Sequence, residues 1–497
     1  ALIHQANSIQ NPALTPSILW FRRDLRLDDN PALAAALSDG APIIPVYIHA
    51  PEEESPWEPG AASRWWLHWS LTALDASLRA RGNRLWILRG PSLDALRRLA
   101  HETGARTIRW NRLYDPATRE RDTRIKQTLR AEGLHCESHK AALLFEPWEV
   151  LNGSGQPYRV FSAFWRACMR SLSVPAPAPA PETVPPPPNP ISPRAALEPE
   201  SLGLLPHRDW DGGLRATWTP GETGALERAR TFIAAGLNDY GTARDRPDRP
   251  GTSRLSPHLH FGEIGPRRLL NWIVAAFGDP AQSIAESYVR ELGWREFGHH
   301  LLHHFPHTTD EPLDGRFDAF PWATEGVEAT LGAWQRGRTG IPLIDAGMRE
   351  LWHTGWMHNR VRMVVASLLT KNLLIPWQEG ARWFWDTLVD ADLAGNTLGW
   401  QWTAGCGADA APYFRVFNPV LQGQRFDPDG VYVRHWCPEL ARLPDKYLQQ
   451  PWAAPQAVLA AAGVRLGRDY PHPIVDLAKS RVRALAAWEQ TNRAAGP

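Results

Sequence analysis

Short apolar runs alternate with amphipathic stretches over about the first 140 residues. Strand-length runs rich in β-branched and aromatic residues occur at SILWF (17–21), PIIPVYI (42–48), RLWIL (84–88), RTIRW (106–110) and LHCESH (134–139). Between them, residues 62–82 and 92–104 repeat apolar side chains at intervals of three and four, which predicts helices. This alternation predicts an α/β domain with a five-stranded parallel sheet, doubly wound and covered by helices on both faces.

The rest of the chain has a different pattern. Residues 174–193, VPAPAPAPETVPPPPNPISP, predict a stiff polyproline-like connector that runs over the surface, although such a segment can also be a docking ligand. From about residue 222 the apolar spacing is helical nearly to the end, with Pro and Gly between the helices. We therefore predict a tail (1–16), an α/β domain (17–145), a connector (146–221), a larger all-helical domain (222–490) and a C-terminal tail (491–497).

Composition narrows the function only slightly. Lys plus Arg is 54 and Asp plus Glu is 53, so nucleic acid could bind only through a local basic patch. There are five lysines against 49 arginines; arginine suits phosphate recognition, but codon bias in a GC-rich genome explains the same excess. Trp is abundant, at 25 residues, and by default this indicates a bulky core.

The cysteines and the chain ends bear on location. Cys136, Cys168, Cys406 and Cys437 are scattered, without C-x-x-C pairs or zinc-ligand spacing, so we expect a reducing compartment and no metal site. The start of the chain has no leader pattern, and no apolar run could span a membrane. The turn after the first run, RRDLRLDDN, lacks G-x-G-x-x-G, which argues against dinucleotide binding of the Rossmann type.

One candidate for phosphate binding is GTSRLSPHLHFGE (251–263). Ser256 followed by Pro257 predicts a helix start with an N-cap serine. Ahead of it, two hydroxyls, an arginine and free backbone amides could cradle a phosphate. An ordinary capped helix explains the same residues.

Two predicted helices carry polar groups on an aromatic or apolar background. In ESYVRELGWREFGHHL (286–301), the side chains of Tyr288, Glu291, Trp294 and Arg295 share a face, although Glu291 and Arg295 could be a surface ion pair. In GWMHNRVRMVVASLLTKN (355–372), the core stripe is Met357, Val361, Val364, Val365, Leu368 and Leu369. A second face of that helix holds Asn359, Arg362 and Met363 with Arg360 beside it, and a helix-surface position is the alternative for Asn359.

The stretch DADLAGNTLGWQW (390–402) combines two aspartates and an amide with two tryptophans. Acidic side chains resist burial unless they are paired, and the two aspartates could pair with Arg362. A phosphate cradle, buried arginines with matching acids and aromatic walls together suit a large, flat, phosphorylated cofactor.

Ordered motifs across nearly the whole chain resemble the photolyase/cryptochrome family of flavoproteins. They run from LWFRRDLRLDDNPAL (19–33) to YPHPIV (470–475) and include LYDP (113–116), EPWEV (146–150), TSRLSPHLHFGEI, ELGWREF, FPW (320–322), GRTGIPLIDAGMREL, TGWMHNRVRM, DADLAGNTLGWQW and YFRVFNP (413–419). The resemblance implies an N-terminal antenna domain, a connector and a helical domain that holds FAD. The mixture of motifs is most similar to class III cyclobutane-dimer photolyases, the bacterial branch related to plant cryptochromes.

By this resemblance, the FAD-binding residues are Tyr240, Thr252, Ser253, Arg254, Leu255, Ser256, Arg295, Trp356, Arg362, Asp390, Asp392 and Asn396. Asn396 would face flavin N5. A chain of redox-active rings, Trp400, Trp377 and Trp322, would lead to the surface, with a side branch at Trp383 or Trp385 as an alternative.

The resemblance also implies the substrate. The residues that contact a pyrimidine dimer in repair enzymes correspond to Glu291, Trp294, Asn359, Arg360, Met363 and Trp402. The expected function is light-driven repair of cyclobutane pyrimidine dimers by an electron from reduced FAD. The alternative is a cryptochrome-type photoreceptor that binds FAD and does not repair; a DNA-binding protein without a cofactor is more remote.

The remaining expectations concern partners. The antenna pigment would be methenyltetrahydrofolate or, as an alternative, a deazaflavin, with contacts that the sequence does not assign. We expect binding to ultraviolet-damaged DNA without sequence preference, no membrane or obligate protein partner, a monomer, and a cytoplasmic location at the bacterial nucleoid.

Overall fold

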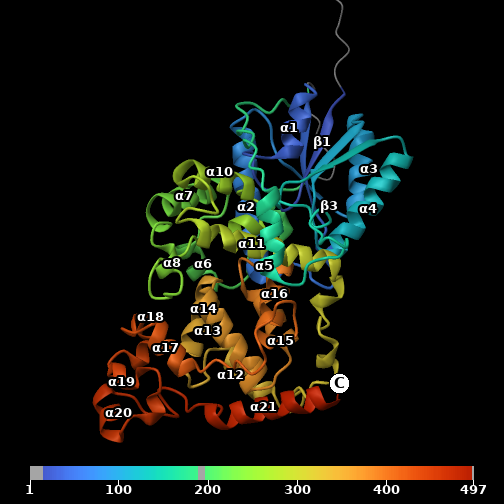
Figure 1. The fold of residues 1–497 in the computed structure, drawn as a ribbon. Helices are drawn as coiled ribbons and strands as arrows, with labels where there is room; N and C mark the ends of the chain where they lie inside the picture. Colours follow the sequence, from blue (N-terminus) through green and yellow to red (C-terminus); the bar gives the residue numbers. More distant parts are fainter. Residues whose placement is uncertain (1–14, 188–195, 495–497) are drawn as a thin grey trace, which may run out of the picture.

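A computed structural model describes residues 15–187 and 196–494. The predicted N-terminal tail lies mostly outside these residues, as does part of the predicted connector, whereas residues 491–494 of the predicted C-terminal tail continue the last helix. The α/β part forms one end of the molecule, and the helical part extends from it to α21 (Leu477–Ala494) at the opposite end (Figure 1).

All five predicted strands are present, and each observed strand end lies within two residues of its predicted position. The strands are β1 (Ser17–Phe21), β2 (Ile43–His49), β3 (Trp86–Arg89), β4 (Thr107–Asn111) and β5 (His135–His139). All neighbours are parallel in the order β3-β2-β1-β4-β5, and β1 is buried along its whole length. The chain order reverses on the two sides of β1, so the sheet is doubly wound, as expected.

The helices of this part follow local sequence signals. They are α1 (Pro31–Ser38), α2 (Ala61–Arg79), α3 (Ser92–Thr103) and α4 (Pro116–Ala131). Asn30 caps α1 by accepting a hydrogen bond from the amide of Leu33 at 3.1 Å, and Pro31 occupies the first turn. Helix α3 ends at Gly104, which has a φ of +68°.

The rest of the chain is helical nearly to its end, as the apolar spacing predicts. Its α-helices and those of the connector are α5 (Phe161–Ser171), α6 (Gly212–Thr217), α7 (Glu222–Thr231), α8 (Tyr240–Ala243), α9 (Ser256–His260), α10 (Pro266–Phe277), α11 (Glu286–His304), α12 (Glu328–Gln335), α13 (Pro342–Thr354), α14 (Asn359–Ser367), α15 (Trp377–Thr387), α16 (Leu393–Ala404), α17 (Pro419–Phe426), α18 (Val431–Trp436), α19 (Asp445–Leu448), α20 (Gln456–Ala462) and α21. Single turns are η1 (Pro51–Glu54), η2 (Pro199–Leu202), η3 (Phe232–Gly236), η4 (Pro306–Thr309), η5 (Gly315–Ala319), η6 (Leu368–Asn372), η7 (Pro438–Leu440) and η8 (Pro451–Ala453).

The connector is only partly a surface spacer. Residues 172–187 form no helix or strand, as predicted, but Val184 is fully buried in the core of the α/β part. The carbonyl of Pro185 accepts a hydrogen bond from the amide of Ile43 at 2.8 Å, and that of Ala178 accepts one from Asp29 at 2.7 Å. The connector is thus held along the sheet domain. The predicted boundaries at residues 145, 221 and 490 stay predictions.

The turn RRDLRLDDN after β1 joins the two parts of the molecule. Arg268 of α10 forms two hydrogen bonds of 2.7 Å with Asp28, and Arg267 donates to Asp29. Glu222 accepts from the backbone amides of Leu27 and Asp28. The turn therefore fixes the sheet domain on the helical region, where we expected only the absence of a nucleotide motif.

Candidate functional site

The segment 252–256 has an unusual backbone and lies between aromatic side chains. Arg254 has a φ of +52°, in the left-handed region that side chains other than glycine rarely adopt. The hydroxyl of Tyr288 on α11 donates to Ser253 at 3.0 Å, and the Arg254 guanidinium lies 4.5 Å from the ring centre of Trp356. Backbone strain of this kind concentrates at binding sites.

The predicted capping role of Ser256 is wrong. The N-cap of the five-residue helix α9 is Leu255, and the Ser256 hydroxyl instead donates to Asp390 at 2.6 Å. Pro257 does occupy the first turn, as predicted. The Ser256 hydroxyl therefore makes a tertiary contact instead of a cap. Its partner, Asp390, lies 134 positions away in the sequence.

The predicted pairing of Arg362 with an aspartate is confirmed for Asp390. Its guanidinium donates to both carboxylate oxygens, at 3.2 and 2.8 Å, and its Nε donates to the carbonyl of Met357 at 2.7 Å. The Asp390 side chain is 3% exposed. Because the pair is bidentate and mostly buried, it holds α14 against the start of the 390–402 stretch.

Asp392 does not pair with Arg362 but with two histidines. Its carboxylate lies 3.4 Å from Nδ1 of His260 and 3.7 Å from Nε2 of His299, and it caps α16 by accepting from the amide of Gly395 at 2.8 Å. Burial alone would raise the pKa of Asp392, but His299, His260 and Arg295 bring it well below its usual range. Asp392 is therefore a charged residue that fixes the start of α16.

The charges of this region suit an anionic cofactor. Arg254 has Glu350 as its nearest carboxylate, at 4.0 Å. Burial raises the pKa of Glu350 to about 7, and the hydroxyl of Tyr432 donates to it at 2.5 Å. Arg254 thus keeps much of its positive charge uncompensated beside the backbone amides of residues 252–256, which is what a diphosphate requires.

The other predicted flavin residues lie on neighbouring elements. Tyr240 on α8 is buried, with its ring edge-on to Tyr288 at 5.2 Å. Arg295 on α11 donates to the carbonyl of Ala142 at 2.7 Å. The side-chain amide of Asn396 donates to the carbonyl of Ala381 at 3.0 Å, so its side-chain oxygen is the group that can accept a further hydrogen bond.

The predicted substrate residues come from three helices. Glu291 and Trp294 lie on α11, Trp402 lies near the end of α16, and the other three occupy the first turns of α14: Asn359, Arg360 and Met363. The Asn359 side chain is exposed, and its amide lies 4.0 Å from the sulfur of Met363. Glu291, Trp294 and Trp402 are partly exposed, so each can meet an incoming ligand.

Two consecutive residues bring α11 and α14 together. Arg244 donates to Glu291 at 2.6 Å, and Asp245 accepts two hydrogen bonds from Arg360 at 2.8 and 3.2 Å. The alternative of a surface pair between Glu291 and Arg295 is therefore wrong. Because Arg244 and Asp245 are adjacent in the chain, Glu291 and Arg360 lie on either side of one short segment.

The three predicted relay tryptophans pack in or against a single core cluster of the helical part. Trp400 is 2% exposed, and its ring meets Phe384 at 4.9 Å and Trp334 at 6.1 Å between centres. The close approach of α15 requires Gly380, because a Cβ there would lie 2.0 Å from the Trp400 ring. Trp377 is 1% exposed, and Trp322 is partly buried.

The tryptophans of the alternative branch lead elsewhere. Trp383 stacks on Trp352, with 6.0 Å between ring centres, and Trp352 is 58% exposed. Trp385 packs edge-on against Trp57 at 5.4 Å and donates to the carbonyl of Glu58. Both paths reach residues near the surface.

An open cavity of about 780 Å³ lies at the carboxyl ends of β1 and β2, between the sheet domain and the helical part. It is lined by Arg22, Arg23, Tyr47, Ile48, His49, Ala50, Pro51, Glu54, Pro59, Ser63, Arg64, Leu67, Leu113, Arg121, His260, Phe261, Trp385 and Ala391. Ligands of open α/β sheets bind at this edge, next to the point where the strand order reverses. Its walls combine basic and aromatic groups, which suits a planar anionic ligand.

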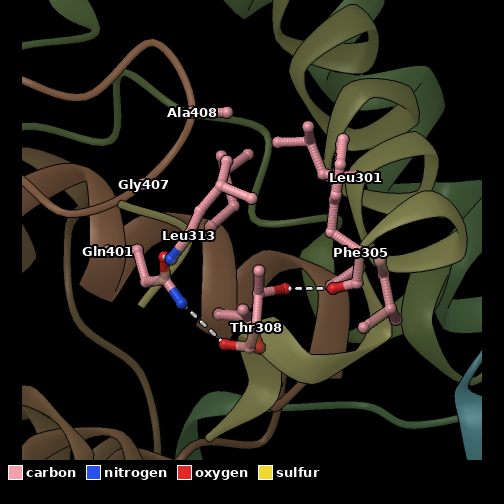
Figure 2. Close-up of a pocket in the computed structure, with 12 residues that line it drawn as sticks. Leu301, Phe305, Thr308, Leu313, Gln401, Gly407 and Ala408 are labelled. Atoms are coloured by element: carbon pink, nitrogen blue, oxygen red, sulfur yellow. Dashed lines mark hydrogen bonds between the residues drawn. The ribbon is translucent and has the colours of Figure 1, made fainter. Parts of the chain in front are cut away.

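A smaller cavity of about 330 Å³ lies between α11 and α16, and its lining is mostly apolar (Figure 2). Its main polar group, Gln401, donates to the carbonyls of Thr308 and Glu311 and accepts from the amide of Leu313. Both of its N–H donors and one acceptor site of its oxygen are thus used to anchor the chain after α11. The lining is otherwise apolar except for Thr308 and Thr397, which does not suit a charged, phosphorylated cofactor.

The sequence alone did not indicate several residues of the site. Arg244 and Asp245 belong to the charged run ARDRPDR, which is typical of a solvated loop, and nothing local indicates their partners 47 and 115 positions away. His260 and His299 were missed because a single histidine on a helix has no specific spacing signal. Among the described residues, no group of histidine, cysteine or acidic side chains could hold a metal ion, and no helix could span a membrane.

Comparisons with known proteins cover most of the chain. Residues 17–182 match the family model described as DNA photolyase, and residues 288–490 match that of the FAD binding domain of DNA photolyase. A deoxyribodipyrimidine photo-lyase of Agrobacterium fabrum is 49% identical over 95% of this chain and 97% of its own length. Cryptochrome-1 of Arabidopsis thaliana is 43% identical over 95% of this chain and 70% of its own length. The crystal structure of a class III photolyase from Agrobacterium tumefaciens superposes with a TM-score of 0.93, at 46% identity, over 98% of this chain and all of the other.

Proposed function

The chain belongs to the DNA photolyase family, and we propose that it is a deoxyribodipyrimidine photo-lyase that repairs cyclobutane pyrimidine dimers with blue light. The observation that carries the proposal is the Arg244–Asp245 segment, which holds Glu291 of α11 and Arg360 of α14 on either side of it. Partly exposed aromatic rings, an acid and a cation on neighbouring helices are what recognition of a flipped-out dimer of two pyrimidine bases requires.

FAD is the cofactor, and the residues around Arg254 and the Arg362–Asp390 pair fit it. We propose that residues 252–256 hold its diphosphate and that Arg295, Trp356, Asp392 and Asn396 surround its ring system. When bound in its reduced form and excited, FAD supplies one electron to the dimer and receives it back, so the reaction has no net oxidation or reduction.

The protein's own residues bind the dimer outside the duplex. Flipping a damaged, poorly paired lesion out of the duplex costs a few kcal/mol. Trp294 and Trp402 stack on the extruded bases, and stacking contributes about 1–3 kcal/mol of binding free energy per base. Asn359 and Met363 lie with Arg360 in the first turns of α14.

The ion pair with Arg244 defines how Glu291 acts. A carboxylate whose Oε1 accepts from Arg244 has its Oε2 available to accept from an imide N–H of the dimer. The Arg244 guanidinium adds a positive charge beside the dimer, where negative charge develops while its two cyclobutane bonds break.

Trp400, Trp377 and Trp322 would pass electrons inward from the surface when the flavin has become oxidised. In a Trp400→Phe variant we expect blue light to leave the flavin oxidised in the presence of an external reductant, because phenylalanine is far harder to oxidise than tryptophan. The chemically reduced variant should still repair dimers. Absorption spectra during illumination measure the first effect.

The control for this prediction is Trp385→Phe, which alters the alternative branch. If Trp385→Phe blocks photoreduction and Trp400→Phe does not, the relay runs through the alternative branch. If neither variant is affected, the proposed chain is wrong.

For the antenna we propose methenyltetrahydrofolate, with a deazaflavin as the alternative, in the 780 Å³ cavity. Three of its arginines are paired with aspartates, namely Arg22, Arg23 and Arg121. Arg64, which donates to the carbonyl of Pro59, suits a glutamyl carboxylate or a phosphate, and Tyr47, Phe261 and Trp385 suit a planar ring. The pigment of the purified protein, released and separated by chromatography, identifies it.

We further propose that the protein acts as a monomer on damaged DNA in the bacterial cytoplasm and nucleoid. Arginines on the surface around α11 and α14 would hold the flanking phosphates, so binding should be independent of sequence and should weaken as salt rises. A second candidate function, a photoreceptor without repair activity, is favoured by the similarity to Cryptochrome-1 of Arabidopsis thaliana.

One experiment separates the two functions. Reduced protein is mixed with an oligothymidine that carries a cyclobutane dimer, and the recovery of thymine absorbance is followed under blue light and in the dark. Recovery only in the light supports repair. A protein that binds and photoreduces flavin but restores no thymine is a photoreceptor, and the proposed repair function is then wrong.

A further inference from the structure

The ring of Trp294 lies flat against that of Phe161. Their centres are 3.8 Å apart and their planes differ by 9°. Phe161 is 1% exposed, and the ring of Trp165 continues the stack, 6.4 Å from Phe161 and inclined by 10°. One face of the Trp294 indole is therefore covered at van der Waals distance, and only its other face is available to a base.

Phe161 is itself fixed from several directions. It is the first residue of α5, and its backbone N–H donates to the carboxylate of Asp409 at 3.1 Å, in the loop that follows Trp402. The Arg290 guanidinium lies 5.2 Å from its ring centre. Helix α11 approaches α5 closely because Gly293 faces Trp165: a Cβ there would lie 2.7 Å from that ring.

We propose that Phe161 is a positioning residue for dimer recognition, which holds the plane of Trp294 so that a flipped-out dimer stacks on its single open face. The inference rests on the proposed function, because it assigns Phe161 a role only if Trp294 contacts the dimer. It also gives the connector helix α5 a part in the substrate site. The bond from Phe161 to Asp409 also ties α5 to the loop that follows α16. Trp402, the second proposed stacking ring, lies near the end of α16.

The test is a Phe161→Leu variant of the full-length, FAD-loaded protein. Leucine keeps an apolar side chain in place but removes the flat surface that orients Trp294. In the dark, the Kd for an oligothymidine with one cyclobutane dimer should rise about three- to tenfold, which corresponds to the contribution of an aromatic pair. The Kd for the same oligothymidine without a dimer should not change, and KM for repair should rise while kcat stays within twofold or so of the wild type.

The matched control is Phe164→Leu on the same helix. Phe164 is also 1% exposed, but its neighbours are Phe297 and His300, with ring centres 5.2 and 4.8 Å away. Its replacement should leave the Kd for the dimer unchanged. If the Leu variant of Phe161 does not fold, Phe161→Met, an apolar and adaptable replacement of similar volume, takes its place.

A double-mutant cycle with Trp294→Ala tests the mechanism. If Phe161 acts through Trp294, Phe161→Leu should not weaken dimer binding further in the Trp294→Ala background. Independent, additive losses would overturn the inference, as would an unchanged Kd in Phe161→Leu or an equal loss in Phe164→Leu. A wild-type protein that does not prefer the dimer would refute the proposed function, and this inference with it.

Discussion

Replacement of Glu291 by alanine is expected to lower light-driven repair by about 100-fold, since a hydrogen bond to a charged group contributes about 1.5–3 kcal/mol. The variant loses the acceptor for the dimer's imide and releases Arg244 from its 2.6 Å contact. Flavin content and photoreduction should not change, because neither is assigned to Glu291. The turnover of the reduced enzyme on the dimer-containing oligothymidine measures the effect.

The control lies on the same helix. Glu286 is the first residue of α11, is 44% exposed and pairs with Arg290 at a distance of 3.8 Å. Glu286→Ala should repair dimers like the wild type. Normal repair by Glu291→Ala would remove the carboxylate from the mechanism, and equal losses in the two variants would point to the stability of α11 instead.

Local patterns predicted the parts of the structure that depend on local physics. A strand buried on both faces shows as a continuous apolar run, so SILWF identified β1 at its observed bounds. Arg362 could be paired with an aspartate of the 390–402 stretch because a buried charge on an apolar background must find a partner, but only the structure selects Asp390 over Asp392. The resemblance added the assignment of such residues to a cofactor, which no spacing rule provides.

Contacts between distant segments could not be predicted in this way. Arg244, Asp245 and Ser256 lie in sequences that suit a solvated loop or a helix cap, and their partners are fixed only by the packing of helices. Phe161 is similar: its apolar character indicates burial, while the stacking on Trp294 depends on how α5 crosses α11. Val184 is buried for the same reason, although its proline-rich surroundings predict exposure.

The second large effect is expected for Asp390→Asn, which should raise the Kd for FAD by about tenfold or more, since a hydrogen bond to a charged group contributes about 1.5–3 kcal/mol and the pair holds two residues of the cofactor site. The change keeps the size of the side chain but leaves the Arg362 charge without its bidentate partner, and it weakens the acceptor for the Ser256 hydroxyl. Both Arg362 and Ser256 are residues that we propose hold the cofactor.

Gel filtration followed by absorption spectroscopy measures the flavin that remains bound, and titration of the stripped protein with FAD gives the Kd. The control is Glu132→Gln, which breaks an exposed pair with Arg97 whose side chains are 39% and 43% exposed. Exposed pairs contribute little, so this variant should retain FAD like the wild type. If Asp390→Asn also retains FAD, the buried pair does not organise the cofactor site, and Arg362 must be held by its contact with the Met357 carbonyl alone.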